Sequence, residues 1–218
     1  MILLHGLLRS PASLNQLEQA LRQEGYITVN QGYPSRDYPI EELAPIAIDP
    51  ALEHCPEGSD INFVTHSLGG ILVRQYASLN HIPNLKRVVM LGPPNKGSEV
   101  VDELEGFYGF EWINGQAGLQ LGTSKTSVPN QLGAVNFDLG VIAGNRSINW
   151  ILSGLIPGED DGKVSIESTK IDGMNEHLVL PVNHAMMMDN ESVIKAVILY
   201  LEQGHWSTQN DISTRTLP

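Results

Sequence analysis

Short apolar runs alternate with amphipathic stretches along most of the chain, which is the pattern of strands and helices around a parallel sheet. Brief apolar runs predict strands at residues 2–4, 27–29, 61–64, 85–91, 141–144 and 178–182. Because helical patterns separate most of these runs, the order of elements predicts an α/β fold with a mostly parallel central sheet.

The expected first and last helices have clear boundary residues. The first follows Ser10 as its N-cap, has Pro11 in its first turn and ends before Gly25. The last covers residues 191–203, has apolar side chains on one face and stops at Gly204. Both ends of the chain therefore contribute helices that can cover a sheet.

Two helices are expected between these, and one segment has no clear pattern. Residues 40–54 predict a helix that Pro45 and Pro50 interrupt, and residues 69–78 predict a buried helix. From about residue 96 to 134 the sequence is Gly-rich and aromatic, without a clear strand. We expect one domain over residues 1–218, in which 96–134 form a short cap segment and 207–218 a loose tail.

Composition narrows the partners and the compartment. The formal charge of −12 argues against a nucleic acid or an anionic membrane surface as the main partner, since both require basic patches. Cys55 is the single cysteine, so no internal disulfide is expected. No apolar run has the length of a membrane span, and the start lacks the pattern of a secretory signal. A cytoplasmic location is expected, with a removed signal peptide left open.

The strongest chemical signal is Thr65-His66-Ser67-Leu68-Gly69, which follows an apolar run and precedes a helical pattern. A serine at a sharp strand-to-helix turn, with glycine two residues later, is typical of a nucleophile elbow. Thr65 departs from this pattern, which has a glycine at that position. The alternative interpretation is an ordinary turn in which Ser67 caps the helix.

Four motifs together resemble bacterial lipases and esterases of the α/β-hydrolase fold. In chain order they are the strand end Ile2-Leu3-Leu4-His5-Gly6, the elbow at Ser67, Asp160-Asp161-Gly162-Lys163-Val164, and Val182-Asn183-His184. The resemblance covers nearly the whole chain. It implies a compact serine hydrolase with helices on both faces of the sheet and the order nucleophile, acid, histidine.

His184 is the expected general base among seven histidines. It follows the expected strand at residues 178–182 and precedes the last helix, where a catalytic imidazole of this fold belongs. His177 precedes the same strand, which places it at the opposite edge of the sheet. His5 and His66 adjoin the elbow or the loop facing it, and we interpret them as structural or pocket-lining.

Asp161 is the expected acid, with Asp160 as the second choice, because the residue before Gly162 matches the acid loop implied by the resemblance. It would accept the Nδ1 proton of His184. An acidic turn or a loose calcium loop that includes Glu159 is the alternative.

The resemblance also implies an oxyanion hole and a substrate pocket. Leu68 would supply one backbone N–H and Leu7 the other. Arg9 lies close by and either orders that loop or forms an ordinary surface ion pair. The aromatic residues of the 96–134 segment either bind an acyl chain or only pack that segment onto the sheet; the expected substrate contacts are Phe107 and Trp112.

The expected function is hydrolysis of carboxylic esters of short to medium acyl chains through an acyl-enzyme. A thioesterase, amidase or acyltransferase would use the same residues, and a non-catalytic binding protein of this fold is the alternative from another class. No cofactor or metal motif is present in the sequence. The expected partner is a small ester or lipid-like molecule, and the sequence does not indicate the oligomeric state.

Overall fold

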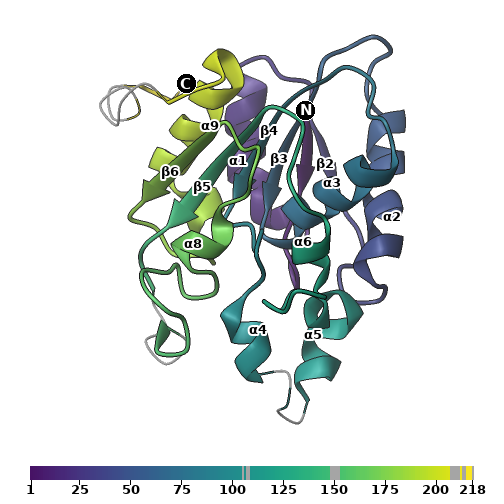
Figure 1. Cartoon of the computed structure of the whole chain (residues 1–218). Helices are drawn as coiled ribbons and strands as arrows, with labels where there is room; N and C mark the ends of the chain where they lie inside the picture. The colour runs from purple at the N-terminus through teal and green to yellow at the C-terminus, as the bar shows by residue number, and fades with distance from the viewer. Residues whose placement is uncertain (105, 107–108, 148–152, 207–211, 213–214, 218) are drawn as a thin grey trace.

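The computed structural model describes residues 1–218 except 105, 107–108, 148–152, 207–211, 213–214 and 218 (Figure 1). The described residues form one parallel sheet with helices on both faces, which confirms the expected fold class. Its strands are β1 (Ile2–Leu4), β2 (Val29–Gln31), β3 (Ile61–His66), β4 (Leu85–Leu91), β5 (Leu139–Gly144) and β6 (Glu176–Leu180).

The strand order places a topological switch point next to β1. The order is β2-β1-β3-β4-β5-β6 and every described pairing is parallel. From β1 the chain moves to one side to form β2, and then returns to form β3 on the other side. In open parallel sheets, ligands bind outside the carboxyl ends of the strands at such a point. The loops after β1 and β3 are therefore the place to look for a site.

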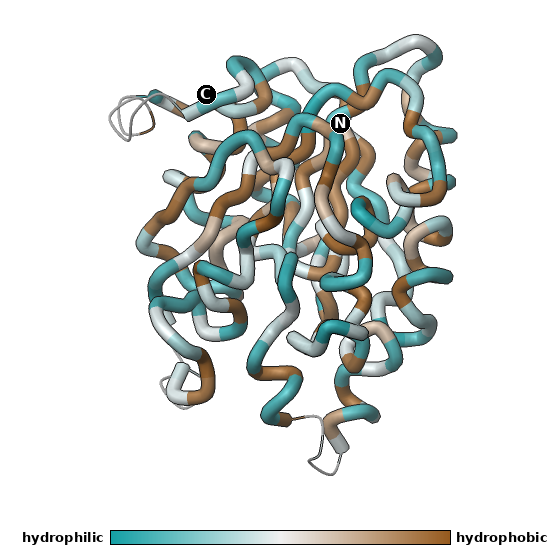
Figure 2. The backbone as a smooth tube through the Cα atoms, viewed as in Figure 1, coloured by the Kyte–Doolittle hydropathy of each residue, from teal (hydrophilic) through white to brown (hydrophobic). Residues whose placement is uncertain are grey.

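Two apolar cores lie on opposite faces of the sheet. On one face, α1 (Asn15–Gln23) and α9 (Glu191–Gln203) cover side chains such as Leu3, Val64 and Val89. On the other face, α2 (Ile40–Glu53) and α3 (Leu68–Leu79) cover neighbouring positions of the same strands. Since successive strand residues point to opposite faces, each central strand contributes to both cores. Figure 2 shows the hydrophobic residues concentrated along the sheet and the inner sides of the helices.

α2 is one continuous helix, whereas its sequence predicts interruptions at Pro45 and Pro50. Pro45 and Pro50 lie inside a helix of 14 residues, although each proline removes a backbone hydrogen bond. One face of α2 is buried against α3 and the sheet, and the Tyr76 hydroxyl donates to Asp49 at 2.6 Å. Tertiary packing therefore outweighs the local preference against a continuous helix.

The first helix and the second strand also differ in detail from expectation. A 3-10 turn, η1 (Pro11–Leu14), precedes α1, and the Ser10 side chain makes no cap hydrogen bond. β2 lies two residues later than predicted, because its backbone pairs with β1 in the register Ile2 to Val29. It is an edge strand, so polar residues such as Asn30 and Gln31 are tolerated there.

The segment without a clear pattern contains short helices. They are α4 (Glu99–Leu104), α5 (Phe110–Leu119) and α6 (Val128–Gln131), and α4 and α5 lie beyond the carboxyl ends of the strands (Figure 1). Short elements α8 (Ile166–Thr169) and η2 (Met187–Asp189) complete the described structure. Among the described residues no helix is both long and apolar enough to cross a bilayer.

The expected loose tail, 207–218, falls mostly on residues that are not described. Of those that are, Ile212 is buried in the core beneath α9. The Arg215 guanidinium pairs with Glu24 and Glu202, at 2.8 Å and 2.6 Å.

Candidate active site

Ser67 occupies the sharp turn between β3 and α3. Its backbone has φ 53° and ψ −119°, a strained conformation for a residue with a side chain. Two hydrogen bonds hold this turn: Ser67 N donates to Leu91 O at 2.9 Å, and Gly70 N donates to Ser67 O at 3.0 Å. The hydroxyl therefore projects from the carboxyl edge of the sheet, as the sequence pattern predicts.

Glycines let the strands and α3 approach each other closely around this turn. A Cβ atom on Gly69 would lie 2.6 Å from Leu4 O, and one on Gly6 would lie 2.7 Å from His66 Nδ1. A Cβ atom on Gly70 would lie 3.2 Å from Thr65 Oγ1, so the absence of a side chain at Gly70 leaves room for the larger residue. The departure at Thr65 is therefore accommodated by the following glycine.

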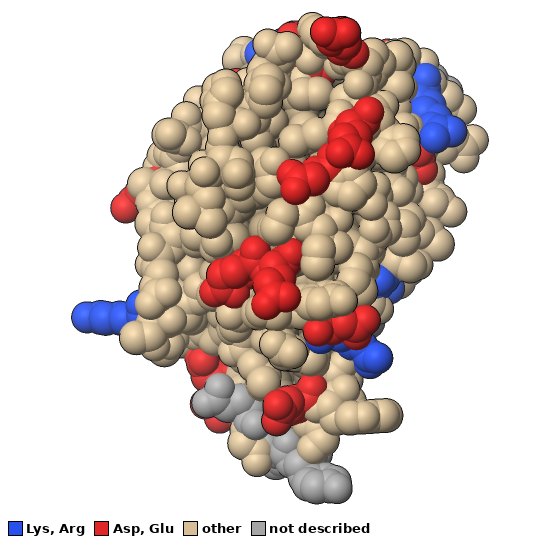
Figure 3. All heavy atoms as spheres, turned by 90° about the vertical axis from the view of Figure 1, so that its right-hand side faces the viewer, with Lys and Arg blue, Asp and Glu red and all other residues tan. Residues whose placement is uncertain are grey.

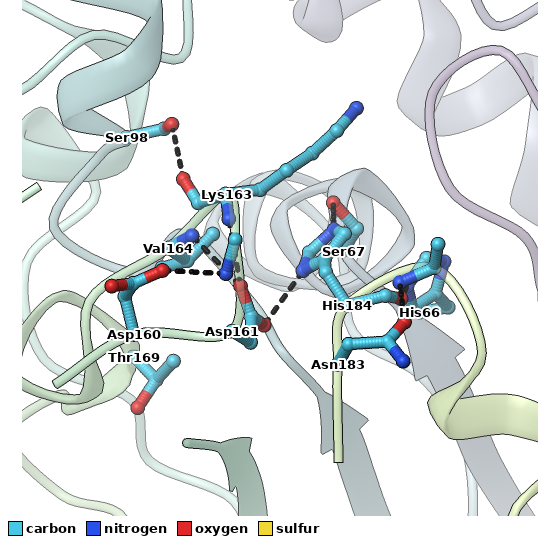
Figure 4. Close-up of polar contacts among 12 residues, drawn as sticks. His66, Ser67, Ser98, Asp160, Asp161, Lys163, Val164, Thr169, Asn183 and His184 are labelled. Atoms are coloured by element: carbon cyan, nitrogen blue, oxygen red, sulfur yellow. Dashed lines mark hydrogen bonds and ion pairs between the residues drawn. The ribbon is translucent and has the colours of Figure 1, made fainter. Parts of the chain in front are cut away.

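Ser67, His184 and Asp161 form one chain of hydrogen bonds (Figure 4). His184 Nδ1 lies 2.7 Å from Asp161 Oδ2, and His184 Nε2 lies 3.1 Å from Ser67 Oγ. Since a carboxylate can only accept, Nδ1 carries the proton, which leaves Nε2 to accept from the serine hydroxyl. The Asp161 and His184 side chains are almost fully buried, with 0% and 7% of their surface exposed.

The loop that carries Asp161 fixes the orientation of its carboxylate. Asp161 Oδ1 accepts from the backbone N–H groups of Lys163 and Val164, at 3.0 Å and 2.9 Å. The backbone N–H of His184 donates to Asp161 O at 2.9 Å, so the two residues are joined twice. These contacts leave Asp161 Oδ2 directed at the imidazole.

Asp160 points elsewhere. Its Oδ1 accepts from Gly162 N at 2.6 Å and from Ser153 Oγ at 2.7 Å. The two neighbouring acids therefore have different positions, one within the loop and one against His184. The described residues contain no cluster of three or more His, Cys, Asp or Glu side chains placed to hold a metal ion.

Sequence reasoning did not identify Gly92, which follows β4. This residue has φ 54°, and a Cβ atom on it would lie 3.0 Å from Asp161 Oδ2 and 3.1 Å from His184 Nδ1. A side chain would therefore press on the acid–base pair. The available sequence signal is Gly92-Pro93-Pro94, which predicts the end of a strand but not a contact with the acid–base pair.

His66 supports the loop that carries His184. Its ring is buried, and Nε2 donates to His184 O at 3.0 Å, with the ring centroids 4.8 Å apart. Burial, followed by the nearby His184, holds the pKa of His66 well below its usual range, so the ring stays neutral. This agrees with the interpretation of His66 as structural and pocket-lining.

The remaining histidines near the sheet are structural in their contacts. The His5 ring stacks on Tyr33 with centroids 4.2 Å apart, and the Tyr33 hydroxyl donates to His5 O. Burial lowers the pKa of His5. His177 lies within β6, where Nε2 and Thr169 Oγ1 are 2.9 Å apart.

Two backbone N–H groups beside Ser67 are candidates for binding an oxyanion. Leu68 begins α3, where the first N–H groups have no partner within the helix. In the loop after β1, the N–H groups of Leu8 and Arg9 donate to Ser35 Oγ and Gly6 O. Leu7 precedes them and lines the same cavity as Ser67.

A cavity of about 330 Å³ opens at Ser67 and His184. Apolar side chains of α4, α5 and the segments beside them form one wall: Val100, Val101, Leu104, Phe110, Ile113 and Leu121.

Trp112, one of the two expected substrate contacts, is not part of this wall. Trp112 is 84% exposed and does not line the cavity, because α5 turns its neighbours Phe110 and Ile113 inward instead. Phe107 lies outside the described residues. A helical pattern over α5 would have predicted that Phe110 and Trp112 face different directions. The sequence does not show this pattern, because the helix is short and is kinked at Gly115.

Comparison of the structure with solved structures gives similar folds at low sequence identity. The lipase BlEst2 of Bacillus licheniformis in its mature form has a TM-score of 0.67 and 16% identity, over 94% of this chain and 91% of that one. The metagenomic carboxyl esterase MGS0156 has a TM-score of 0.69 and 17% identity, over 94% and 76% of the two chains.

Phospholipase PlaB of Legionella pneumophila in complex with thio-NAD has a TM-score of 0.72 and 17% identity. The match covers 97% of this chain but only 59% of PlaB. No protein-family model matches the sequence, and no curated protein matches it. At these identities the similarity concerns the fold, and the chemistry has to be argued from the residues of this site.

Proposed function

We propose that this chain, which has the α/β-hydrolase fold, is a serine hydrolase that cleaves carboxylic esters of short to medium acyl chains through an acyl-enzyme. The observation that carries the proposal is the chain of hydrogen bonds from Ser67 through His184 to Asp161 at the mouth of an apolar cavity. A nucleophile, a base and an orienting acid in hydrogen-bond contact are the elements of nucleophilic acyl transfer.

In the acylation step, Ser67 Oγ attacks the ester carbonyl carbon while His184 Nε2 takes the hydroxyl proton. The carbonyl oxygen becomes an oxyanion that the N–H groups of Leu68 and Leu7 stabilise. The imidazolium then donates its proton to the departing alcohol as the carbon–oxygen bond breaks. Asp161 keeps Nδ1 protonated and stabilises the imidazolium throughout.

In the deacylation step, water replaces the alcohol. His184 takes a proton from the water as it attacks the acyl carbon, and the same two N–H groups stabilise the second oxyanion. The imidazolium returns its proton to Ser67 Oγ, which releases the carboxylic acid. The products are therefore one alcohol and one acid, and the enzyme regains its starting protonation state.

Ester substrates fit this cavity through their acyl chain. The apolar wall of α4 and α5 can cover methylene groups, each of which contributes about 0.8 kcal/mol when buried. The cavity of about 330 Å³ is at the small end of ligand pockets, which favours a short to medium chain.

Ser67→Ala tests the proposal. The variant removes one half-buried hydroxyl at the cavity, so it should fold normally but lower kcat for p-nitrophenyl butanoate by about a thousandfold or more. A fluorophosphonate ester should label the wild-type protein at Ser67 only. Ser78→Ala is the matched control, because Ser78 lies at the far end of α3 and its hydroxyl donates to Gln75 O.

Retention of a tenth of the wild-type kcat by Ser67→Ala would exclude Ser67 as the nucleophile. A wild-type protein that is neither labelled nor active would support the alternative of a binding protein with this fold.

A further inference from the structure

Two basic side chains, Arg9 and Lys163, line the same cavity as Ser67. Arg9 comes from the loop after β1, and Lys163 lies two residues after Asp161. Figure 4 shows the Lys163 side chain extended past Ser67 and away from Asp161. No Asp or Glu is among the described residues that line the cavity, although acids outnumber bases by 25 to 13 in the whole chain.

Neither cation has an ionic partner in the described part of the chain. The Arg9 guanidinium donates to Ala185 O at 3.2 Å, which occupies one of its N–H groups. Lys163 Nζ makes no described hydrogen bond or ion pair. Basic side chains elsewhere, such as Lys86 and Arg215, are paired with carboxylates at 2.6 Å.

Several carboxylates on the elements around the cavity are already hydrogen-bonded to other groups. Asp161 is bonded to His184 and to the loop backbone, and Glu99 accepts from Ser165 and Ser168. Asp102 on α4 is bonded to Thr123. Asp102, Glu103 and Glu111 are the exposed acids among the described residues of α4 and α5, and none of them lines the cavity.

The positive charges of Arg9 and Lys163 repel each other when no anion is bound in the cavity. Desolvation lowers the pKa of Lys163, and the like charge of Arg9 lowers it further, while Asp161 opposes these effects. An anion bound between them would relieve this repulsion and restore the charged form of the lysine. The acidic surface on the side of α2, shown in Figure 3, would instead repel an anion.

The position of Arg9 next to His184 indicates which part of an ester substrate it can contact, the acyl chain or the departing alcohol. Arg9 is bonded to the carbonyl of Ala185, the residue directly after the base. In the proposed mechanism His184 donates its proton to the departing alcohol, whereas the acyl chain lies against the apolar wall of α4 and α5. Arg9 therefore lies on the leaving-group side, and Lys163 lines the same cavity close enough to feel the charge of Arg9.

We propose that the substrate is an ester whose alcohol moiety carries a negative charge, a carboxylate or a phosphate, which Arg9 and Lys163 bind. This inference rests on the proposed function, because it assigns a substrate class to the same site. Arg9 can hold two oxygens of such a group at once, and Lys163 adds a point charge.

The test compares matched anionic and neutral esters with the same acyl group. One pair is meta-(butanoyloxy)benzoate and meta-(butanoyloxy)benzamide, and the other is butanoylglycerol phosphate and monobutanoylglycerol. The ratio of kcat/KM for the anionic ester to that for the neutral ester should fall about fivefold in Arg9→Gln and in Lys163→Gln, equivalent to about 1 kcal/mol each. The pair with the larger drop identifies carboxylate or phosphate as the preferred group.

Controls separate charge recognition from general damage. Arg9→Lys should recover most of the ratio, and Lys125→Gln should leave it at the wild-type value, because Lys125 is exposed and does not line this cavity. Added NaCl should reduce the wild-type ratio by screening.

The outcomes distinguish the two proposals. Unchanged ratios in both variants, with Ser67 labelled and the neutral esters hydrolysed, would overturn the anionic substrate and leave the esterase intact. Failure to label Ser67 or to hydrolyse any of the four esters would overturn the proposed function, and this inference with it.

Discussion

At the scale of single residues, Asp160 and Asp161 provide the sharpest test of the proposed mechanism. Asp161→Asn should lower kcat by about a thousandfold, because an amide cannot hold the imidazole in the required tautomer or stabilise its charged form. Asp160→Asn keeps an oxygen for Gly162 N and Ser153 Oγ, so its kcat should stay within a few-fold of wild type. Steady-state kinetics with p-nitrophenyl butanoate measure both, and the reverse ranking would assign the acid role to Asp160.

His66 makes a prediction about stability and pH. Burial holds the pKa of His66 well below the ordinary histidine value of 6.5, so the folded protein keeps the ring neutral while the unfolded chain takes up a proton. The free energy of unfolding should therefore be fully retained above pH 6.5 and should fall as the pH drops below it. The contribution of one such histidine is about 1 kcal/mol between pH 6.5 and about 5.5.

Urea unfolding of His66→Gln tests this prediction, because glutamine does not titrate and can still donate to His184 O. The variant should lose less stability than wild type over that range. His81→Gln is the control, since His81 is exposed on the loop after α3. Equal slopes for wild type and His66→Gln would show that His66 is not kept neutral by the fold. His5 and His177, whose pKa values burial also lowers, should account for part of the remaining slope.

At the scale of elements, the contact between α3 and β1 depends on Gly69. Alanine there would gain up to about 1 kcal/mol from helix propensity, but its Cβ would lie 2.6 Å from Leu4 O and 3.0 Å from His5 O. Because backbone atoms cannot move aside easily, Gly69→Ala should lower the free energy of unfolding by about 1–3 kcal/mol. It should also lower kcat, since a displaced α3 moves the Leu68 N–H.

Urea unfolding of Gly69→Ala and Gly106→Ala measures the effect. Gly106 is the matched control, because a Cβ atom there would meet nothing within 4 Å. A Gly69→Ala protein as stable as wild type would show that α3 shifts away from β1 without cost.

The sequence predicted best the helices and strands whose boundaries are set by neighbouring residues. β4 and α9 match their expected bounds because each has a continuous apolar pattern, and α9 has an Asn190 cap and a Gly204 stop. α2 was predicted to be interrupted at Pro45 and Pro50, whereas burial of one face keeps it continuous. The helices of the 96–134 segment were not predicted, because α4 and α6 are short and α5 contains a kink at Gly115.

The residues of the candidate site also differ in how well the sequence predicted them. Ser67, His184 and Asp161 follow strands or loops whose order predicts a common edge, and the structure brings them into hydrogen-bond contact. The roles of Gly92 and His66 depend on distances between segments far apart in the chain, which a sequence pattern does not contain.

At the scale of the whole molecule, α4 and α5 form the cavity wall that would hold the acyl chain under the proposed function. Phe110 lines the cavity, whereas Trp112 on the same helix faces solvent. Phe110→Ala should therefore shift the preferred acyl length toward longer chains, and Trp112→Ala should leave the preference where it is. A series of p-nitrophenyl esters from acetate to hexadecanoate measures both variants. A shift with Trp112→Ala alone would restore Trp112 as the substrate contact.

The size of the α4–α5 wall also predicts the response to dispersed substrate. The two helices have 6 and 10 residues, which is too little to form a large amphipathic lid over the site. The cavity at Ser67 is already open, so no lid movement at an interface is needed to admit an ester. In the wild type, kcat/KM should rise roughly fourfold for each added methylene until the cavity is full, and the optimum should fall at short to medium chains. Rates measured across the solubility limit of each ester should increase smoothly, and a sharp rise at that limit would indicate a true lid.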